Sequence, residues 1–301
     1  MSNKPDAKSW AILILLTLIW GFSYYFIKHS LISFSPTQIS ALRMIISFVM
    51  LIPFIPHAFK KISFDKYWPI FVCGFIGSFL PAFLYPFAQT KISSSLAGII
   101  NAFTPICTYS IGILFYEVAK EKSKIAGSII ALLGAIILIG FKPNASFKAE
   151  GLYVLIAFIV PFLYGLNGNI LKSKLAGIPG VPLTALMYVM MAVLSIPVAI
   201  YSGAFRQIPV AIQSGNAFYH LLALSAFGSA IAMVLFNILI QRVHILFAAS
   251  VTYLMPCVSL IVGWLDGEQI GWNDIAGFVF ILFGVLIINQ VIRWKSTETA
   301  V

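Results

Sequence analysis

Charged side chains are scarce in this sequence. Only 9% of its 301 residues are Asp, Glu, Lys or Arg, whereas a soluble domain has about 25%. Hydrophobic residues make up 60% of the chain, which is more apolar surface than a soluble core of this length could hide. We therefore expect most of the molecular surface to face lipid and the bilayer to be its main partner.

Several chemical signatures are also missing. Cys73, Cys107 and Cys257 lie inside apolar runs without the spacing of a metal site or a disulfide framework. No acid pair and no cluster of His with acid falls deep in an apolar run, as a membrane metalloenzyme or protease would need. No glycine-rich phosphate loop is present. We expect no catalytic residue, no metal and no cofactor.

Charge of one sign predominates. The formal net charge is +10, which on a soluble protein would suggest a nucleic-acid partner. Here the basic residues fall in short gaps between apolar runs, where membrane topology explains them better. We therefore expect no nucleic-acid partner.

Ten apolar segments qualify as membrane helices, which need about 20 residues each. They cover residues 10–31, 36–56, 67–89, 96–116, 125–141, 152–171, 183–201, 218–241, 246–265 and 275–294. The fifth is short. The first has no small-residue cleavage site after it, so we interpret it as a retained helix rather than a signal peptide. The fold class predicted is an all-α membrane protein with ten transmembrane helices.

The basic residues predict the orientation of these helices. If the N-terminus is inside, the inner loops and tails hold 13 Lys and Arg residues and the outer loops hold 5. The positive-inside rule then places both termini in the cytoplasm, with the protein in the cytoplasmic membrane. Arg43 is the remaining basic residue, and it lies within the second segment.

The chain also repeats itself. Residues 77–117 align without gaps on residues 228–268, an offset of 151, and the alignment pairs Gly77 with Gly228 and Pro105 with Pro256. "KIAGSIIALLGAIILIG" then resembles "DIAGFVFILFGVLIIN", and "WGFSYYFIK" parallels "YGLNGNILK". Because each copy holds five helices, an odd number, the second enters the membrane from the opposite side. We expect two inverted repeats, residues 1–145 and 146–301, around a central cavity.

This pattern resembles the drug/metabolite transporter superfamily in its EamA-type branch. The resemblance rests on "LIWGFSYYFIK" in the first segment, "SPTQISALRMI" in the second and the repeated block that runs from Pro through Glu to Ala-Gly and Gly. It implies a ten-helix fold whose central cavity is lined by the first, third and fourth helices of each copy. It also implies export of small metabolites or amino acids.

Polar residues surround the repeated prolines. Asn101, Thr104 and Thr108 share a helix face, and Thr252 and Ser259 occupy the positions of Asn101 and Thr108 in the second copy. Such residues either line a solute pathway or only hold the helices together by hydrogen bonds. We favour the pathway because the polarity recurs. Pro105 and Pro256 are candidate hinges, although a kink that serves helix packing is an equal alternative.

Other candidates for solute binding lie on the first and third segments of each copy. The residues are Trp20, Ser23, Tyr24, Ser78, Tyr85, Tyr164, Asn167, Ser229 and Asn237. Aromatic walls with a few hydrogen-bonding groups are typical of small-molecule sites. An interfacial aromatic belt is excluded for Trp20, which lies about 15 Å into its helix, but it remains an alternative for Tyr24.

Three charged residues need separate explanations. Arg43 lies about 10 Å along its helix, and it could bind an anionic solute group or a carboxylate, or it could extend to the surface or tie down helix ends. Glu117 and Glu268 end the fourth helix of each copy. They are possible gate residues, but anchoring of a helix end at the interface is favoured.

These observations favour a secondary transporter that works by alternating access. The alternatives are a scaffold or sensor that transports nothing, disfavoured by the short loops, and a membrane-embedded enzyme, disfavoured by the missing catalytic cluster. The coupling mechanism is open between proton coupling, uniport and exchange. Neither the particular solute nor the oligomeric state is predicted.

Overall fold

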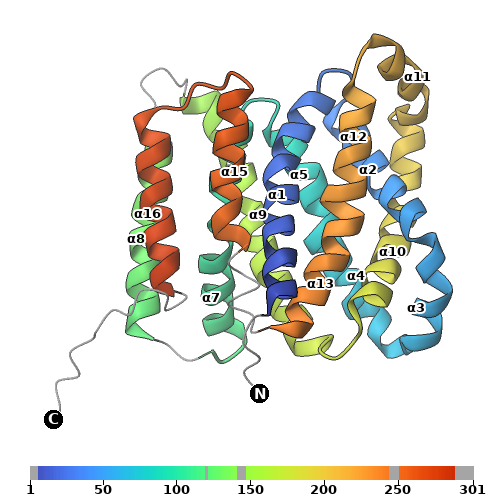
Figure 1. Ribbon diagram of the computed structural model, residues 1–301, viewed down its shortest axis with the longest axis horizontal. Coiled ribbons are helices and arrows are strands. Elements are labelled where there is room, and N and C mark those ends of the chain that lie inside the picture. Colours follow the sequence, from blue (N-terminus) through green and yellow to red (C-terminus); the bar gives the residue numbers. More distant parts are fainter. Residues whose placement is uncertain (1–5, 119–120, 141–146, 244–250, 289–301) are drawn as a thin grey trace.

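The protein is a bundle of helices, seen in a computed structural model that describes residues 6–118, 121–140, 147–243 and 251–288 (Figure 1). All regular structure in these ranges is helical. The first half contains α1 (Ala7–Ser30), α2 (Pro36–Leu51), η1 (Ile52–Phe54), α3 (Ile55–Lys61), η2 (Phe64–Lys66), α4 (Tyr67–Gly74), η3 (Phe75–Phe79), α5 (Leu80–Ala88), α6 (Ser94–Asn101), α7 (Thr104–Phe115) and α8 (Lys122–Gly140). The second contains α9 (Phe147–Lys174), α10 (Gly180–Tyr201), α11 (Ala204–Ser214), α12 (Ala217–Ser225), η4 (Ala226–Ile231), α13 (Ala232–Arg242), α15 (Val251–Leu265) and α16 (Trp272–Ile288).

Seven helical stretches are long and apolar enough to cross a membrane. They are Ala7–Ser30, Pro36–Lys61, Phe64–Ala88, Ser94–Phe115, Gly151–Lys174, Gly180–Tyr201 and Ala217–Leu239. Three shorter apolar helices accompany them: Ile125–Gly134, Leu254–Leu265 and Trp272–Gly284. The prediction of an all-helical membrane protein is confirmed for the described part of the chain.

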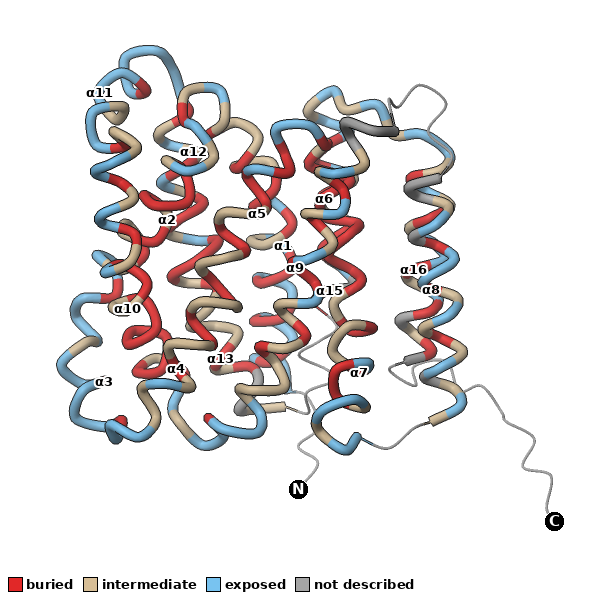
Figure 2. The backbone as a smooth tube through the Cα atoms, turned by 180° about the vertical axis from the view of Figure 1, so that it is seen from behind, coloured by how far each residue is buried: buried red, intermediate tan, exposed pale blue. Residues whose placement is uncertain are grey.

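The outer surface of the bundle is apolar, as a lipid environment requires. Buried residues follow the faces that the helices turn toward one another, whereas exposed residues follow the outward faces (Figure 2). Ile200 and Leu155 are 66% and 63% exposed. Large aromatic side chains are exposed near helix ends, with Trp272 at 83% and Tyr201 at 96%. That is the placement that membrane–water interfaces favour for Trp and Tyr.

Local signals in the sequence set the helix starts. Asp6 accepts a hydrogen bond from the backbone N–H of Ser9 at 2.8 Å and caps α1. Ser35 and Gln38 form a reciprocal capping box at the start of α2, with Pro36 as its first residue. Ser93 caps α6 with its side-chain oxygen, which accepts from the backbone N–H of Leu96 at 3.2 Å. The first, second and fourth segments thus begin close to where the sequence predicts.

Two stretches of π-helix interrupt equivalent helices. η3 lies between α4 and α5, and η4 lies between α12 and α13. They begin 151 residues apart, which is the offset of the sequence repeat. A π-helix widens the turn and changes which carbonyl groups are paired within the helix, and such segments are frequent at functional sites.

Glycines bring helices of the two halves into close contact, and these contacts come in equivalent pairs. A Cβ at Gly21 would lie 2.5 Å from the Cβ of Val258. At Gly165, the residue 144 positions later, a Cβ would lie 3.1 Å from the Cβ of Cys107, which is 151 positions before Val258. In lipid, close packing of small residues replaces the hydrophobic drive to associate.

Equivalent glycine contacts also occur between α8 and α16, which pack side by side at one edge of the molecule (Figure 1). A Cβ at Gly134 would lie 2.8 Å from the carbonyl oxygen of Gly277, and a Cβ at Gly284 would collide with the carbonyl oxygen of Gly127. Gly127 and Gly277, like Gly134 and Gly284, are 150 residues apart. The two helices therefore approach backbone to backbone.

Two features differ from the expected segments. The fourth segment is not one helix, because α6 ends at Asn101 and α7 begins at Thr104, with Pro105 in the first turn of α7. Pro105 therefore opens a helix, which suits a residue without a backbone donor. The second difference is α11, an amphipathic helix in a stretch where a loop was expected.

Candidate solute-binding site

Arg43 lies at the centre of the polar residues that the fold brings together. Its Nε donates to Ser229 Oγ at 2.6 Å, and its Nη2 lies 3.4 Å from the carbonyl oxygen of Gly228. Trp20 Nε1 donates to the same carbonyl oxygen at 3.2 Å. Ser229 and Gly228 belong to the π-helix η4, so this segment presents a carbonyl that α1 and α2 both use.

Three tyrosine side chains lie near this guanidinium. The charge of Arg43 acts on Tyr24, Tyr164 and Tyr188, which come from α1, α9 and α10. Tyr188, Ser229 and Ser78 are all buried. Tyr188 was not among the residues that the sequence singled out. Its counterpart in the first copy, 144 residues earlier, is the apolar Met44. Because the position is not polar in both copies, the repeat gave no reason to select Tyr188.

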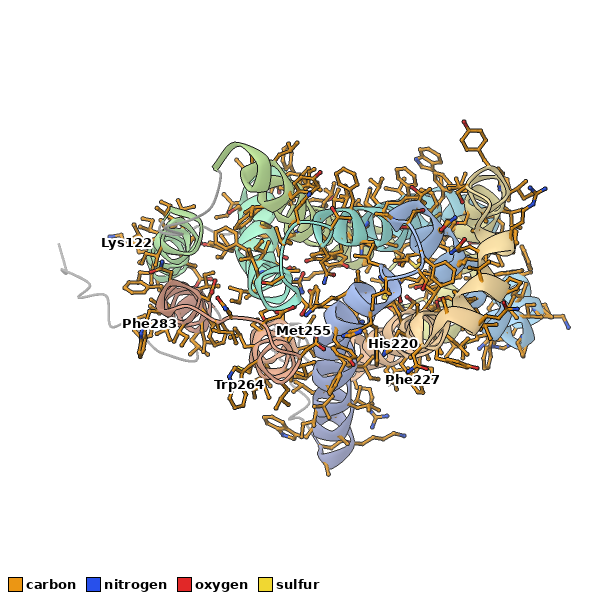
Figure 3. All side chains as sticks on the ribbon, turned by 90° about the horizontal axis from the view of Figure 1, so that it is seen from above. Lys122, His220, Phe227, Met255, Trp264 and Phe283 are labelled. Carbon is orange, nitrogen blue, oxygen red and sulfur yellow. The ribbon has the colours of Figure 1, made fainter. Side chains whose placement is uncertain are left out.

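Asn101 faces the opposite copy. Its Oδ1 accepts from the Tyr85 hydroxyl at 3.0 Å, and its Nδ2 lies 3.9 Å from Met255 Sδ on α15. Met255 points into the bundle, whereas Trp264 on the same helix points outward (Figure 3). The Tyr85 ring also packs edge-on against Tyr24, with centroids 5.3 Å apart. Four elements, α1, α5, α6 and α15, therefore converge here.

Two buried amide oxygens near the central residues have no hydrogen-bond partner in the described part of the chain. Asn167 Oδ1 is one, and Asn167 lies directly against Gly77 in η3. Gln89 Oε1 is the other, while Gln89 Nε2 donates to the carbonyl oxygen of Tyr24 at 2.9 Å. A buried acceptor left unpaired is costly. These two oxygens are therefore suited to receive donors from water or a solute.

Ser23 and Tyr164 complete the interior set from the first helix of each copy. Ser23 donates to the carbonyl oxygen of Ile19 at 2.9 Å and lies against Gly228. Tyr164 is partly buried against the core, one helical turn before Asn167. Ser23 therefore contacts η4, whereas Tyr164 lies near Arg43.

Other predicted residues serve contacts between helices. Asn237 Nδ2 donates to Thr184 Oγ1 at 2.8 Å, between α13 and α10. Thr108 donates to the carbonyl oxygen of Thr104 within α7, and its own carbonyl oxygen accepts from Asn169 Nδ2 of α9 at 3.0 Å. Ser259 lies against Gly98 of α6. The recurring polar positions in the sequence therefore include residues that pack helices together as well as residues of the central site.

Thr252 and Pro256 lie on α15, with Pro256 inside that helix. Thr252 is partly buried one turn before Met255, the residue that Asn101 contacts. The stretch that leads into α15, residues 244–250, is outside the described residues. The arrangement around Pro256 can therefore be compared with that around Pro105 only from residue 251 onward.

A groove of 290 Å³ lies away from these residues, between α7 and α8. Its lining is apolar except for two serines and the tyrosine, and consists of Phe103, Ile106, Tyr109, Ser110, Ile113, Ile125, Ser128, Ile129 and Leu132. The predicted central residues instead contact one another directly, as the Tyr85–Asn101 and Arg43–Ser229 hydrogen bonds show. We assign the polar chemistry to these central residues, because the groove offers an apolar surface that suits lipid chains.

Glu268 follows α15 and ties the two copies together, at the end of the bundle where α15 connects to α16 (top of Figure 1). Its carboxylate accepts from the backbone N–H groups of Ser94 and Ser95, both at 3.0 Å, and from their hydroxyls, both at 2.6 Å. Lys28 Nζ lies 3.1 Å from the same carboxylate and 2.5 Å from Asp266. The carboxylate thus binds the N-terminal end of α6, where the helix dipole favours negative charge.

Glu268 is an acid held in its charged form. Burial alone would raise its pKa, but the hydrogen bonds from Ser94 and Ser95 outweigh burial and lower the pKa from 4.5 to about 2. The pKa of Asp266 is also lowered: burial acts against this, and hydrogen bonds from Lys28 and His29 prevail. This end of the bundle is therefore closed by charged groups that favour contact at neutral pH.

Glu117 has the equivalent position in the first copy but a different environment. It follows α7, has a φ of +53° and is exposed. No described residue bonds to its side chain, in contrast to the bonds around Glu268. The serines that bind Glu268 correspond, 151 residues later, to Ile245 and Leu246, which have no hydroxyl to donate.

A membrane protein built from many apolar helices around a polar centre is the class that this structure defines. Residues 8–140 and 151–290 match the EamA-like transporter family, and the chain belongs to that family. Its family and relatives indicate a multi-pass membrane transporter of small solutes rather than an enzyme.

Relatives align over nearly the whole chain. An uncharacterized transporter of Archaeoglobus fulgidus is 24% identical over 93% of this chain and 98% of that protein. A probable terminal-alkyne amino-acid exporter of Streptantibioticus cattleyicolor is 24% identical over 99% of this chain and 98% of that protein. The uncharacterized inner membrane transporter YedA of Escherichia coli is 23% identical over 92% of this chain and 89% of that protein.

One crystal structure of another protein shares the fold. It superposes with a TM-score of 0.66 over 95% of this chain and 98% of the other, at 17% sequence identity. At this identity the likeness shows the fold alone.

Proposed function

We propose that the protein is a secondary transporter that exports small metabolites or amino acids across the cytoplasmic membrane by alternating access. The observation that carries this proposal is the polar centre, where Arg43, Trp20 and Asn101 meet residues of the opposite copy. Polar groups in a membrane interior are costly and mark solute pathways. Trp20, Tyr24, Tyr85, Asn101 and Asn167 are the side chains that would contact the solute.

We propose that the transporting unit has ten membrane helices in two inverted repeats, residues 1–145 and 146–301. The paired glycine contacts support this arrangement, because Gly21 with Val258 and Gly165 with Cys107 are the same contact made twice with the copies exchanged. The two π-helices at one repeat offset support it as well. The excess of basic residues in the inner loops supports cytoplasmic termini.

Alternating access would come from rocking of one copy against the other. Glu268 with Lys28, Ser94 and Ser95 would be the closed gate at the outer end. Glu117, exposed at the opposite end, would belong to a weaker inner gate. The break between α6 and α7 beside Pro105 would supply a hinge, with Pro256 as its counterpart.

Amino acids are the first solutes to test, because one relative of this chain is named as a probable amino-acid exporter. The purified protein would be reconstituted into liposomes loaded with a labelled panel of amino acids, organic acids, nucleosides and amines. Efflux of a defined subset, abolished by Trp20→Ala, supports the proposal. If no solute moves faster than in protein-free liposomes, the proposed function fails.

A further inference from the structure

We propose that Arg43 is a subsite for a carboxylate, so that the transported solute must carry a carboxyl group. The inference rests on the proposed transport function and specifies the chemistry of its site. It would make Arg43 a determinant of specificity, in addition to its contacts with η4.

Hydrogen bonds to the described residues use only some of the N–H donors of the guanidinium. An arginine carries five N–H groups, and the described residues use one at Nε, toward Ser229 Oγ, and one at Nη2, toward the Gly228 carbonyl at 3.4 Å. The remaining N–H groups, including both on Nη1, have no partner among the described residues. Two adjacent guanidinium N–H groups match the two oxygens of a carboxylate.

Among the described residues, no acid serves as a counterion for Arg43. All nine acidic residues lie outside the ten apolar segments of the sequence, and none in the described ranges forms an ion pair with Arg43. The side chain that Arg43 contacts is the uncharged Ser229, and the nearby Tyr24, Tyr164 and Tyr188 are not acids. A positive charge kept in the membrane interior without an acid is suited to an anionic ligand.

The position equivalent to Arg43 in the second copy holds a neutral residue. "SALRM" (residues 40–44) corresponds to "TALMY" (residues 184–188) at an offset of 144, which pairs Arg43 with Met187. Met187 is 1% exposed, and its side chain packs against Gly74 at the end of α4. A neutral side chain therefore fills the equivalent place between helices in the second copy. Packing at this position of the repeat does not require a charge, and we assign the charge of Arg43 to solute binding.

The test compares three forms of one solute in the reconstituted protein. L-Leucine carries both charges, 4-methyl-2-oxopentanoate carries the carboxylate alone, and L-leucinamide carries the ammonium group alone. Equivalent triplets with larger and smaller side chains cover differences in solute size. We expect the wild type to transport the two carboxylates at least about tenfold better than the amide.

Three variants assign this preference to Arg43. Arg43→Met introduces the residue of the second copy and should weaken carboxylate transport about 10- to 100-fold without lowering that of the amide. Arg43→Lys keeps the charge and should retain part of the preference. Arg242→Met is the matched control, because Arg242 bonds to Asp6 at a helix end, and it should behave as wild type.

The outcomes separate the two proposals. A wild type that transports amides as well as carboxylates, or an Arg43→Met protein with unchanged preference, overturns the carboxylate subsite and leaves transport standing. If the wild type moves no member of any triplet or of the wider panel, the transport function fails and the subsite fails with it. If Arg43→Met does not fold, the selectivity of the wild type and of Arg43→Lys decides.

Discussion

Glu117 and Glu268 occupy one position of the repeat but make different contacts. The bonds from Ser94 and Ser95 to Glu268 join loops and helices of both copies, whereas Glu117 is exposed. A carboxylate with several charge-assisted hydrogen bonds contributes more than a surface charge. The anchoring that the sequence favoured describes Glu268 better than Glu117.

Replacing Glu268 by Gln should therefore destabilise the protein. The amide keeps the shape but presents N–H groups to the donors of Ser95 or Ser94, so we expect a loss of about 1–3 kcal/mol in the free energy of unfolding. Glu117→Gln is the matched control and should change stability little. Thermal denaturation in detergent checks both variants. Equal melting temperatures for the two would contradict this assignment.

The same carboxylate predicts a pH dependence. The pKa of Glu268 is about 2 in the folded protein and 4.5 in the absence of these contacts. A lowered pKa means that the stabilisation is complete above about pH 4.5 and is lost as the pH falls toward about 2. We expect the melting temperature of the wild type to fall through this window more steeply than that of Glu268→Gln. Parallel curves would argue against a charged contact.

Asn101 and Tyr85 form a buried pair whose members should depend on each other. Asn101→Leu leaves the Tyr85 hydroxyl without its acceptor and should cost about 1–3 kcal/mol. Adding Tyr85→Phe removes that unpaired group, so the double variant should recover part of the stability. Melting temperatures of the four proteins complete the cycle. Transport should weaken in both Asn101 variants, and normal transport would remove Asn101 from the proposed site.

Individual contacts were less predictable than residue types. The repeat marked Asn101, Ser229 and Glu268 because polarity recurs at equivalent positions. It could not reveal that Glu268 binds Ser94, because that contact joins residues 174 positions apart. Tyr188 carried no signal, since a tyrosine in an apolar helix is common and its counterpart is methionine. Pairing across copies depends on the fold, which the pattern leaves open.

Among the helices, α8 and α16 offer a direct test of close packing. A Cβ on Gly284 would collide with the backbone of Gly127 and lie 2.6 Å from the N of Ala131. Backbone atoms cannot rotate away, so Gly284→Ala should separate the helices and cost about 1–3 kcal/mol. Gly168→Ala on α9 is the control, because a Cβ there meets nothing within 4 Å. Its replacement should be neutral or stabilising.

Thermal denaturation of both alanine variants in detergent provides the measurement. A stable Gly284→Ala protein would mean that α8 and α16 do not approach as closely as their backbones indicate. A destabilised Gly168→Ala protein would show that alanine is harmful in these helices for another reason. The comparison therefore separates contact between helices from the properties of a single helix.

The positions of the helices were predictable wherever a run of apolar residues determines them. The first, second and third segments lie close to Ala7–Ser30, Pro36–Lys61 and Phe64–Ala88. The π-helices were not foreseen, because a pair such as Gly77 and Ser78 is compatible with an ordinary helix. α11 was missed because Pro209 and the flanking glycines suggested a loop. Its amphipathic pattern was the signal that could have identified it.

Over the whole molecule, the repeat and the charge pattern carried most of the prediction. The all-helical membrane class follows from composition, and family membership agrees with it. The contacts around Glu268 could not be predicted from the sequence, because they depend on how the two copies pack against each other. Lys28 and Asp266 meet across that boundary. A single sequence does not specify at which end of the bundle charged residues of the two copies bind each other.

The orientation in the membrane is the last prediction. Lys61 ends α3, and Gln213 lies in α11; both are exposed, at opposite ends of the bundle. With Cys73, Cys107 and Cys257 replaced by Ala, single cysteines at these positions report each side. Because basic residues gather in the inner loops, an impermeant thiol reagent should label Gln213→Cys in intact cells and Lys61→Cys only after permeabilisation. The reverse pattern would invert the topology and move the proposed gate at Glu268 to the cytoplasmic side.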